Sequence, residues 1–498
     1  MASEDHSLID RRSFLKTGTA GLAAAGLFSG TSSAYHDLAD DYGSFLDVTE
    51  HGADPGGDDS VSGVIEDLAD DDTLLKFPSG RYYMDRMVRF TDFEHFGMVG
   101  KSDATLVPAD FHSFSDGTNK LFRLGNPDSP GNGLHLENFE VDMTADDTGA
   151  RVFDVAVDDG LFVDDINVNG RHDSGSWGPA LFRITDSGGE GVVRDFRAPD
   201  GGASTDQAPA NHLWRGPTGI LCTWAHEGSI RFQNCKLGGF PDNGLYAAGG
   251  SGDVYVEGGR YTNSGTASIR VGGGGDIAVT GATVAVDRQP WDIPQEGIRI
   301  NSGDWVMVDN VEINMPRPSG EGINVGNGVE SACIKNLRMT LGEDPMVGIH
   351  VHGDAGPTYM KHVDIEINGS NNAIQIEGED AGRVGLQNVN IDGDAGGGTM
   401  RHAIRCLRNE CQFRDVTIDQ PGGNKRRGIA ILGEHTYVEG CDIAASERGF
   451  SVMNGPAWLQ ENRSVSYDDD RASIKIFDDV DRDDVRLKGN EFPNGIDA

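Results

Sequence analysis

One short alternation of apolar and polar residues returns along most of the chain. It reads EGIRI at residues 296–300, EGINV at 321–325 and VGIHV at 347–351. The central apolar residue of successive copies stands at nine positions: 220, 245, 269, 298, 323, 349, 374, 404 and 429. The steps between them are 25, 24, 29, 25, 26, 25, 30 and 25 residues, which is the length of one supersecondary unit.

A second phrase follows within 10 to 15 residues in these units, as VDNVEI at 308–313, IKNLRM at 334–339, LQNVNI at 386–391 and FRDVTI at 413–418. Alternation with a period of two predicts short strands in both phrases, and Asn or Gly bends the chain between them. Such a unit cannot bury its apolar face alone, so the repeat predicts stacked coils of a parallel β-solenoid. About ten coils are expected between residues 218 and 455, with Ile298, Ile323, Ile349 and Ile374 in one internal row.

The region before the repeats adds a family resemblance. It contains FLDVTEHGADP at 45–55, a helical pattern over Val61 to Leu68 with Asp59 or Ser60 as the expected N-cap, and LLKFPSGRY at 74–82. This order of strand, helix and strand resembles the start of the pectate lyase-like (pectin lyase fold) superfamily. The resemblance spans residues 45 to 455 and implies an all-β fold, a right-handed parallel β-helix with an N-terminal capping helix. Because members include lyases, hydrolases, epimerases and non-catalytic proteins, it implies no single reaction.

We expect three segments. Residues 1–34, with RRSFLK at 11–16 and a small-residue apolar run, are typical of a twin-arginine signal peptide cut after Ala34. Residues 35–455 form the β-helix with its cap, and residues 456–498 form a C-terminal capping segment and acidic tail with strands at 474–476 and 485–487. The product is therefore expected to be secreted, monomeric and without a membrane span.

The net charge of the chain excludes some classes of binding partner. The chain has 80 acidic and 41 basic residues, a net charge of −39, which disfavours nucleic acid and anionic membranes. We interpret the acidity as surface chemistry for solubility in high salt, as in proteins of salt-loving archaea, with specific cation binding as the alternative. The six cysteines lack CxxC spacing, so we expect buried core thiols, with a Cys222–Cys235 bridge as the alternative.

If Ile298 and Ile300 point inward, the residues between and after them point out. Two outward columns follow: Leu221, Tyr246, Arg270, Arg299, Asn324, His350, Gln375, Arg405 and Ala430; then Thr223, Ala248, Gly272, Asn301, Gly326, His352, Glu377 and Leu407. They predict a cationic or titratable stripe on an acidic body, about 24 Å long from Arg270 to Arg405. Glu296 and Glu321 stand at the start of two of its strands. The alternative is that the arginines pair with ladder neighbours on a solvated face.

Long turns at 199–217, 287–295 and 392–401 all precede the repeated phrase, so a solenoid stacks them along one edge. Trp214, Trp224 and Trp291 lie in or beside the first two turns, where they suit either sugar stacking or core packing. The sequence His350-Val351-His352 has zinc-like spacing, but no third ligand is evident, so the metal remains unassigned.

The stripe and the resemblance together suggest a polysaccharide lyase-like enzyme acting on acidic, uronate-containing polysaccharide. By resemblance, Arg299 is the candidate base, Arg270 its partner for the substrate carboxylate, and Tyr246 or His350 the proton donor, with bound Ca²⁺ neutralising the carboxylate. The candidate substrate-binding residues are Trp214, Trp224, Trp291, Asn301, Asn324, His352, Arg405, Glu296 and Glu321. The calcium-site aspartates and catalytic motifs of the lyases and pectin hydrolases are missing. A non-catalytic glycan-binding protein and a β-helix glycoside hydrolase or epimerase therefore stay open.

Overall fold

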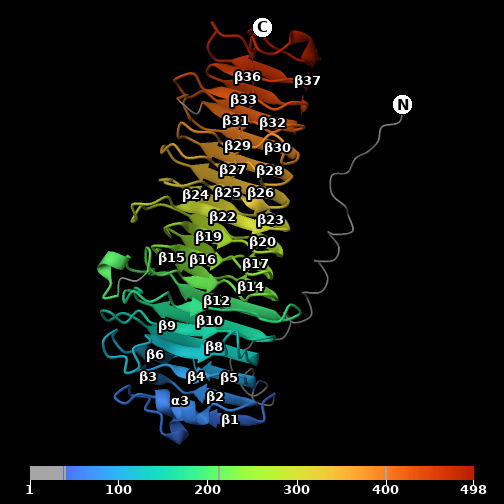
Figure 1. The fold of residues 1–498 in the computed structure, drawn as a ribbon. Helices are drawn as coiled ribbons and strands as arrows, with labels where there is room; N and C mark the ends of the chain where they lie inside the picture. The colour runs from blue at the N-terminus through green and yellow to red at the C-terminus, as the bar shows by residue number, and fades with distance from the viewer. Residues whose placement is uncertain (1–37, 39–40, 102, 211–212, 399–400) are drawn as a thin grey trace.

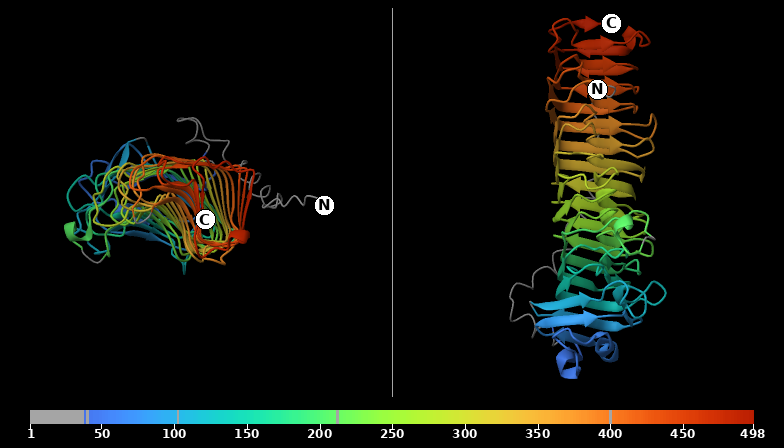
Figure 2. Two further views of the ribbon diagram at one scale, coloured as in Figure 1. Left: turned by 90° about the horizontal axis from the view of Figure 1, so that it is seen from above. Right: turned by 90° about the vertical axis from the view of Figure 1, so that its left-hand side faces the viewer.

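The chain winds into one long parallel β-solenoid, with its N-terminal coils at one end and its C-terminal coils at the other (Figure 1). The computed structural model describes residues 38, 41–101, 103–210, 213–398 and 401–498. The predicted export signal lies outside these residues. Seen along the axis, successive coils superpose (Figure 2). The prediction of a parallel β-helix is confirmed.

The coils share two sheets. Sheet B contains one strand of each coil, 16 in all among the described residues: β4 (Val88–Phe90), β7 (Lys120–Leu124), β9 (Arg151–Val155), β11 (Ala180–Leu181), β13 (Ile220–Cys222), β16 (Asn243–Ala247), β19 (Ala267–Val271), β22 (Glu296–Gly303), β25 (Ile323–Val329), β27 (Ile349–Val351), β29 (Ile374–Ile376), β31 (His402–Cys406), β33 (Arg427–Ile431), β36 (Arg448–Val452), β39 (Ile474–Ile476) and β41 (Ile496–Asp497). Ten of these strands, β13 to β36, lie between residues 218 and 455, as predicted.

Sheet A contains the remaining 25 strands of the described chain: β1 (Ser44–Asp47), β2 (Thr73–Phe77), β3 (Gly80–Met84), β5 (Glu94–Gly100), β6 (Ala104–Pro108), β8 (Asn132–Asp142), β10 (Leu161–Asn169), β12 (Glu190–Ala198), β14 (Ser229–Gln233), β15 (Lys236–Gly238), β17 (Asp253–Glu257), β18 (Arg260–Thr262), β20 (Asp276–Thr280), β21 (Thr283–Ala285), β23 (Trp305–Asp309), β24 (Glu312–Met315), β26 (Ala332–Leu341), β28 (Thr358–Ile367), β30 (Val384–Asp392), β32 (Gln412–Gln420), β34 (Thr436–Glu439), β35 (Asp442–Ala445), β37 (Ala457–Gln460), β38 (Arg463–Ser466) and β40 (Val485–Lys488).

The second repeated phrase forms a corner within sheet A. Its middle residues have left-handed backbone conformations, with φ of 53° at Asn310, 51° at Asn336 and 52° at both Asn388 and Asp415. Asparagine and aspartate tolerate this region because their short polar side chains bond locally. Asn336 also bonds between coils, since its Nδ2 donates to Asp309 Oδ1 of the preceding coil at 2.8 Å. The predicted bend at Asn is present, but it lies inside the second phrase and not between the two phrases.

The first phrase supplies the core. Ile298, Ile323, Ile349 and Ile374 pair in register and are fully buried, so the predicted internal row is confirmed. Gly297 precedes this row because a Cβ there would stand 2.5 Å from the carbonyl oxygen of Gly322 in the next coil. Close stacking of coils therefore excludes a side chain at that position.

The N-terminal end begins with a short 3-10 helix, η1 (Val48–His51), and helix α3 (Ser62–Leu68). The expected N-cap at Asp59 or Ser60 is wrong, because the N-cap residue is Val61; its own side chain makes no capping bond, and the Ser60 hydroxyl accepts from the N–H of Ser62 at 3.4 Å. Ser60 also donates its hydroxyl to Asp85 Oδ1 at 2.6 Å, which ties the turn to the next coil. Two further 3-10 turns, η2 (Thr205–Gln207) and η3 (Arg482–Asp484), lie in loops.

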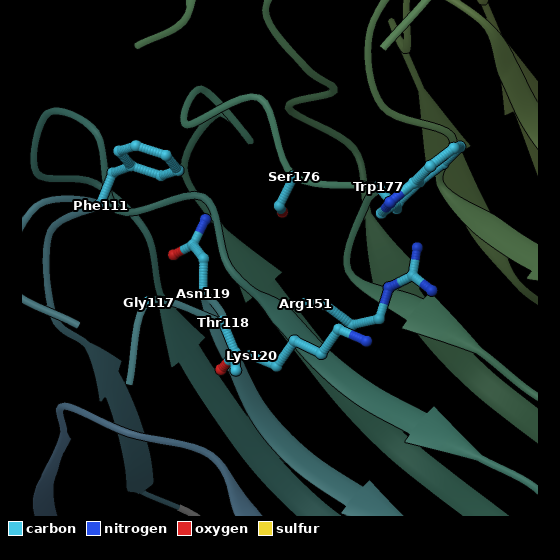
Figure 3. A pocket seen from close by; sticks show the side chains of 8 residues that line it. All are labelled: Phe111, Gly117, Thr118, Asn119, Lys120, Arg151, Ser176 and Trp177. Carbon is cyan, nitrogen blue, oxygen red and sulfur yellow. The ribbon is translucent and has the colours of Figure 1, made fainter. Parts of the chain in front are cut away.

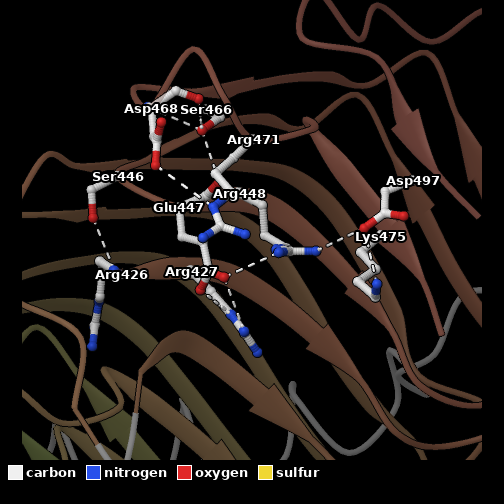
Figure 4. Close-up of polar contacts among 10 residues, drawn as sticks. All are labelled: Arg426, Arg427, Ser446, Glu447, Arg448, Ser466, Asp468, Arg471, Lys475 and Asp497. Carbon is white, nitrogen blue, oxygen red and sulfur yellow. Dashed lines mark hydrogen bonds and ion pairs between the residues drawn. The ribbon is translucent and has the colours of Figure 1, made fainter. Parts of the chain in front are cut away.

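The C-terminal coils continue the ladders, with β39 and β40 at the two strands expected there. Charged side chains link these coils (Figure 4). Glu447 accepts a hydrogen bond from Arg448 at 3.0 Å and also pairs with Arg427, while Lys475 donates to Asp497 at 2.9 Å.

The six cysteines are all free and buried, as expected of core thiols, and the alternative Cys222–Cys235 bridge is not formed. Burial raises the pKa of both thiols to about 12. No helix among the described residues has the length and apolar character needed to cross a membrane.

Candidate active site at the start of the central strands of sheet B

The predicted outward column is present in the register of sheet B. Successive ladder pairs join Tyr246 to Arg270, Arg270 to Arg299, Arg299 to Asn324, Asn324 to His350, His350 to Gln375 and Gln375 to Arg405. Their neighbours on either side, such as Ile298 and Ile300, are fully buried. The column therefore points away from the core, with its side chains about 4.8 Å apart along the sheet, but its central members Asn324, His350 and Gln375 are buried and not solvent-exposed as predicted.

The two central arginines have different surroundings. Arg299 donates from Nη1 to Glu296 Oε1 at 3.3 Å and from Nε to Asn301 Oδ1 at 3.2 Å. The Arg270 guanidinium lies 4.5 Å from the centre of the Tyr246 ring. Its buried Nε has no hydrogen-bond partner within the described chain. The contacts of Arg299 are thus to its own strand, β22, whereas Arg270 stacks on its ladder neighbour Tyr246 and forms no ion pair with a described carboxylate.

Glu296 is the most perturbed acid of this face. Its side chain is only 11% exposed, and one carboxyl oxygen, Oε2, is buried without a partner among the described residues. Burial, together with the nearby charge of Glu321, raises its pKa from the ordinary 4.5 to about 7 against the opposing effect of Arg299. Glu296 is therefore a carboxyl group that is about half protonated at neutral pH.

Glu321 follows Glu296 by one coil, since each stands two residues before the paired Ile298 and Ile323. Both of its oxygens have donors: Asn324 Nδ2 lies 2.7 Å from Oε2, and His350 Nδ1 lies 2.6 Å from Oε1. Adjacent coils thus place a half-protonated carboxyl group beside a second one that is fully hydrogen-bonded.

His350 connects this pair to the next coils. Burial alone would lower its pKa, but the hydrogen bond to Glu321 and the charges of Glu321 and Glu377 outweigh burial and raise it. His350 Nε2 lies 3.4 Å from Glu377 Oε1, which also accepts from Gln375 Nε2 at 2.7 Å. Asn372 donates to Gln375 Oε1 at 2.9 Å and completes a chain of contacts across three coils.

Gln375 and Glu377 stand in the predicted outward columns, but the sequence assigned neither a role. Asn372 lies three residues before Gln375, where no periodicity marks it. The sequence could have indicated Asn372 by its position, because it is the first residue of a repeated phrase, as Glu296 and Glu321 are.

The structure brings a third potential metal ligand to the two histidines. Ligand atoms of Glu321, His350 and His352 lie within 4.8 Å of one another, and the two imidazole rings stack with centroids 4.0 Å apart. One carboxylate and two imidazoles suit zinc or a similar transition metal. They do not suit Ca²⁺, which takes six to eight oxygen ligands. The calcium ion implied by the family resemblance therefore does not fit this group.

The remaining predicted residues are scattered. Trp214 is 79% exposed and Trp224 is 63% exposed, whereas Trp291 is partly buried and donates its indole N–H to the Asn263 carbonyl oxygen at 3.1 Å. Trp214 and Trp291 precede β13 and β22, and Trp224 follows β13, so they belong to different edges of sheet B. Arg405 has no ion pair or hydrogen bond to any described residue and remains available to an anion on β31.

No model of a known protein family matches the chain, and no curated protein matches it. Among solved structures, an N-terminal fragment of bacteriophage phi29 gene product 12 is similar, with a TM-score of 0.53 and 10% identity over 86% of this chain and 70% of that one. A family 28 exopolygalacturonase of Yersinia enterocolitica has a TM-score of 0.32 and 12% identity over 78% of this chain and 79% of that one. At these identities the likeness is one of fold alone.

Proposed function

We propose that the protein hydrolyses glycosidic bonds of an acidic polysaccharide, with Glu296 as the general acid. The observation that carries this is the buried, half-protonated carboxyl of Glu296 beside the fully hydrogen-bonded carboxyl of Glu321. Glycoside hydrolysis uses two carboxyl groups whose surroundings separate their pKa values. Glu296 protonates the leaving oxygen as the glycosidic bond breaks, and Glu321 stabilises the positive charge that develops on the sugar ring. A water molecule then adds to the anomeric carbon, and the proton it releases restores the acid form of Glu296.

The cations of the same face support an acidic substrate. Arg270 and Arg405 have no carboxylate partner among the described residues, on a protein with a net charge of −39. A guanidinium binds a carboxylate through two parallel hydrogen bonds and holds it in a fixed orientation. The column from Arg270 to Arg405 spans five ladder steps, about 24 Å, which accommodates several sugar units.

The contacts of Arg299 favour hydrolysis over the lyase reaction. In the lyase hypothesis Arg299 abstracts a proton, which requires its neutral form. Here its Nη1 and Nε donate to Glu296 and Asn301, so these two nitrogens serve as hydrogen-bond donors and do not face a substrate proton. We therefore assign Arg299 a positioning role toward Glu296. Export by the twin-arginine pathway remains a prediction from residues 11–34.

The test compares products and variants on polygalacturonate, alginate and hyaluronan. Hydrolysis releases reducing ends without ultraviolet absorbance, whereas elimination releases an unsaturated uronate that absorbs. We expect Glu296→Gln to lower kcat by about 10²- to 10⁴-fold with little change in KM. The matched control is Glu312→Gln, on the exposed face of β24 in sheet A, which should leave kcat unchanged.

Three results would contradict the proposal. An ultraviolet-absorbing product would assign the site to elimination. Full activity of Glu296→Gln would remove the general acid. Binding of a polymer with no product after long incubation would assign the protein to the non-catalytic class.

A further inference from the structure

A pocket of about 370 Å³, lined by both polar and aromatic side chains (Figure 3), opens near the N-terminal end of sheet B. Lys120 and Arg151, the first residues of β7 and β9, line it from neighbouring strands and are direct ladder partners. Five ladder steps separate β9 from β22, which carries Glu296, so the two sites lie about 24 Å apart along one sheet.

Positive charge exceeds negative charge at this pocket. One carboxylate, Asp154, is shared by three cations: Lys120 at 2.7 Å, Arg123 at 2.8 Å and Arg183 at 3.6 Å. Lys120 and Arg151 themselves line the pocket, whereas Asp154, Arg123 and Arg183 lie beside its lining. Basic groups therefore outnumber acidic ones around this end of β7 and β9, on a chain whose net charge is −39. An anion is the ligand that such a site attracts.

Arg151 lacks a partner for part of its guanidinium. It is 3% exposed, and its Nε donates to the Gly178 carbonyl oxygen at 3.0 Å, but its buried Nη2 has no partner within the described chain. A buried charged group without a counterion is costly, because water no longer solvates it. A carboxylate in the pocket would accept from Arg151 Nη2 and from the Lys120 ammonium group.

The rest of the lining suits a sugar. Asn119 Oδ1 is buried without a donor, so it is ready to accept from a hydroxyl group. Trp177 is 56% exposed and presents a flat ring of the kind on which sugar rings pack. Ser176 also lines the pocket, but its hydroxyl already donates to the Gly149 carbonyl oxygen at 2.9 Å and lies 2.6 Å from His172 Nε2. The volume falls at the lower end of the range for small-molecule sites, about 300–1,000 Å³.

We propose that this pocket binds one uronic acid residue, with its carboxylate on Arg151 and Lys120, its hydroxyl groups toward Asn119 and its ring against Trp177. The inference that the pocket binds a carboxylate rests only on its own basic residues, Arg151 and Lys120. The choice of a sugar as its carrier rests on the proposed function. A polymer held here would extend along sheet B toward Glu296, so the pocket anchors one acidic unit at a distance from the cleaved bond.

The test is isothermal titration of the full chain with D-galacturonate and, separately, D-glucuronate, with D-galactose and acetate as the neutral and sugar-free probes. We expect at least one uronate to bind and both other probes to bind at least tenfold more weakly. Lys120→Met and Trp177→Ala should each weaken uronate binding by about tenfold or more. Because Arg151 is buried, its substitution could prevent folding and is not used. Trp177 is exposed, so its substitution tests binding in a folded protein.

The matched control is Lys76→Met. Lys76 also pairs with one aspartate, Asp47 at 2.8 Å, and its side chain is 25% exposed against 21% for Lys120, but it lies in sheet A. This variant should bind uronate like the wild type. Glu296→Gln should also keep uronate binding while it loses turnover, so loss of the proposed catalysis would leave the pocket proposal standing. Three results would overturn the pocket proposal. They are a wild-type protein that binds no uronate, pocket variants that both bind uronate unchanged, and acetate that binds as tightly as uronate.

Discussion

The raised pKa of Glu296 makes a quantitative prediction about stability. In the unfolded chain this carboxyl has its ordinary pKa of 4.5, and in the folded protein burial raises the pKa to about 7. The folded state therefore binds more protons than the unfolded state between these two values. The stability that Glu296 contributes is fully present below pH 4.5 and is lost as the pH rises through 7.

The perturbation is Glu296→Gln, which keeps the shape and removes the charge. Each pH unit between the two pKa values corresponds to about 1.4 kcal/mol, so the wild type loses about 3 kcal/mol from this group across the interval. The glutamine variant does not lose it. The measured quantity is the free energy of unfolding of the variant minus that of the wild type. This difference should be about 3 kcal/mol larger at pH 8 than at pH 4.

The assay is urea unfolding followed by circular dichroism at pH 4 and pH 8, at one constant high salt concentration. Taking the difference between variant and wild type cancels the groups they share. His350 is one of these, since its raised pKa also gives stability that is lost as the pH rises through its folded pKa. Glu312→Gln, exposed on β24, should change stability by the same small amount at both pH values.

A variant whose stability differs from the wild type by the same amount at both pH values would refute the reasoning. It would mean that water or a counterion reaches Glu296 and that its pKa is ordinary. The general-acid role would then lose its physical basis, because the carboxyl would be ionised at neutral pH.

Two further predictions concern the whole solenoid. Lowering the salt from about 1 M to about 0.01 M lengthens the Debye screening distance from about 3 Å to about 30 Å, so a net charge of −39 should lower Tm, and a Tm independent of salt in calorimetry would contradict this. Ile323→Ala, in the fully buried internal row, should cost about 2–5 kcal/mol in urea unfolding, whereas Arg338→Ala on the exposed face of β26 should cost under about 0.5 kcal/mol, and equal losses would contradict the stacking argument.

The repeat predicted the architecture because its causes are local. Alternation in a strand decides which way Ile298 and Arg299 point, and equal spacing of the phrases lets coils stack with Ile323 beside Ile298. The internal row and the direction of the outward column follow from these two properties. The N-cap was missed because the Ser60 hydroxyl bonds Asp85, 25 residues away, and no local rule contains that contact.

The chemistry of the face depended on the tertiary structure. The pKa of Glu296 is set by burial and by charges on neighbouring coils, and Glu321 meets His350 across 29 residues. The pocket at Lys120 and Arg151 escaped prediction because the early coils depart from the repeated phrase, although both residues stand at the start of their strands. The reason is general to this fold: alternation along one strand fixes the direction of a side chain, whereas its charge state depends on which side chains the adjacent coils place beside it and on how far they exclude water.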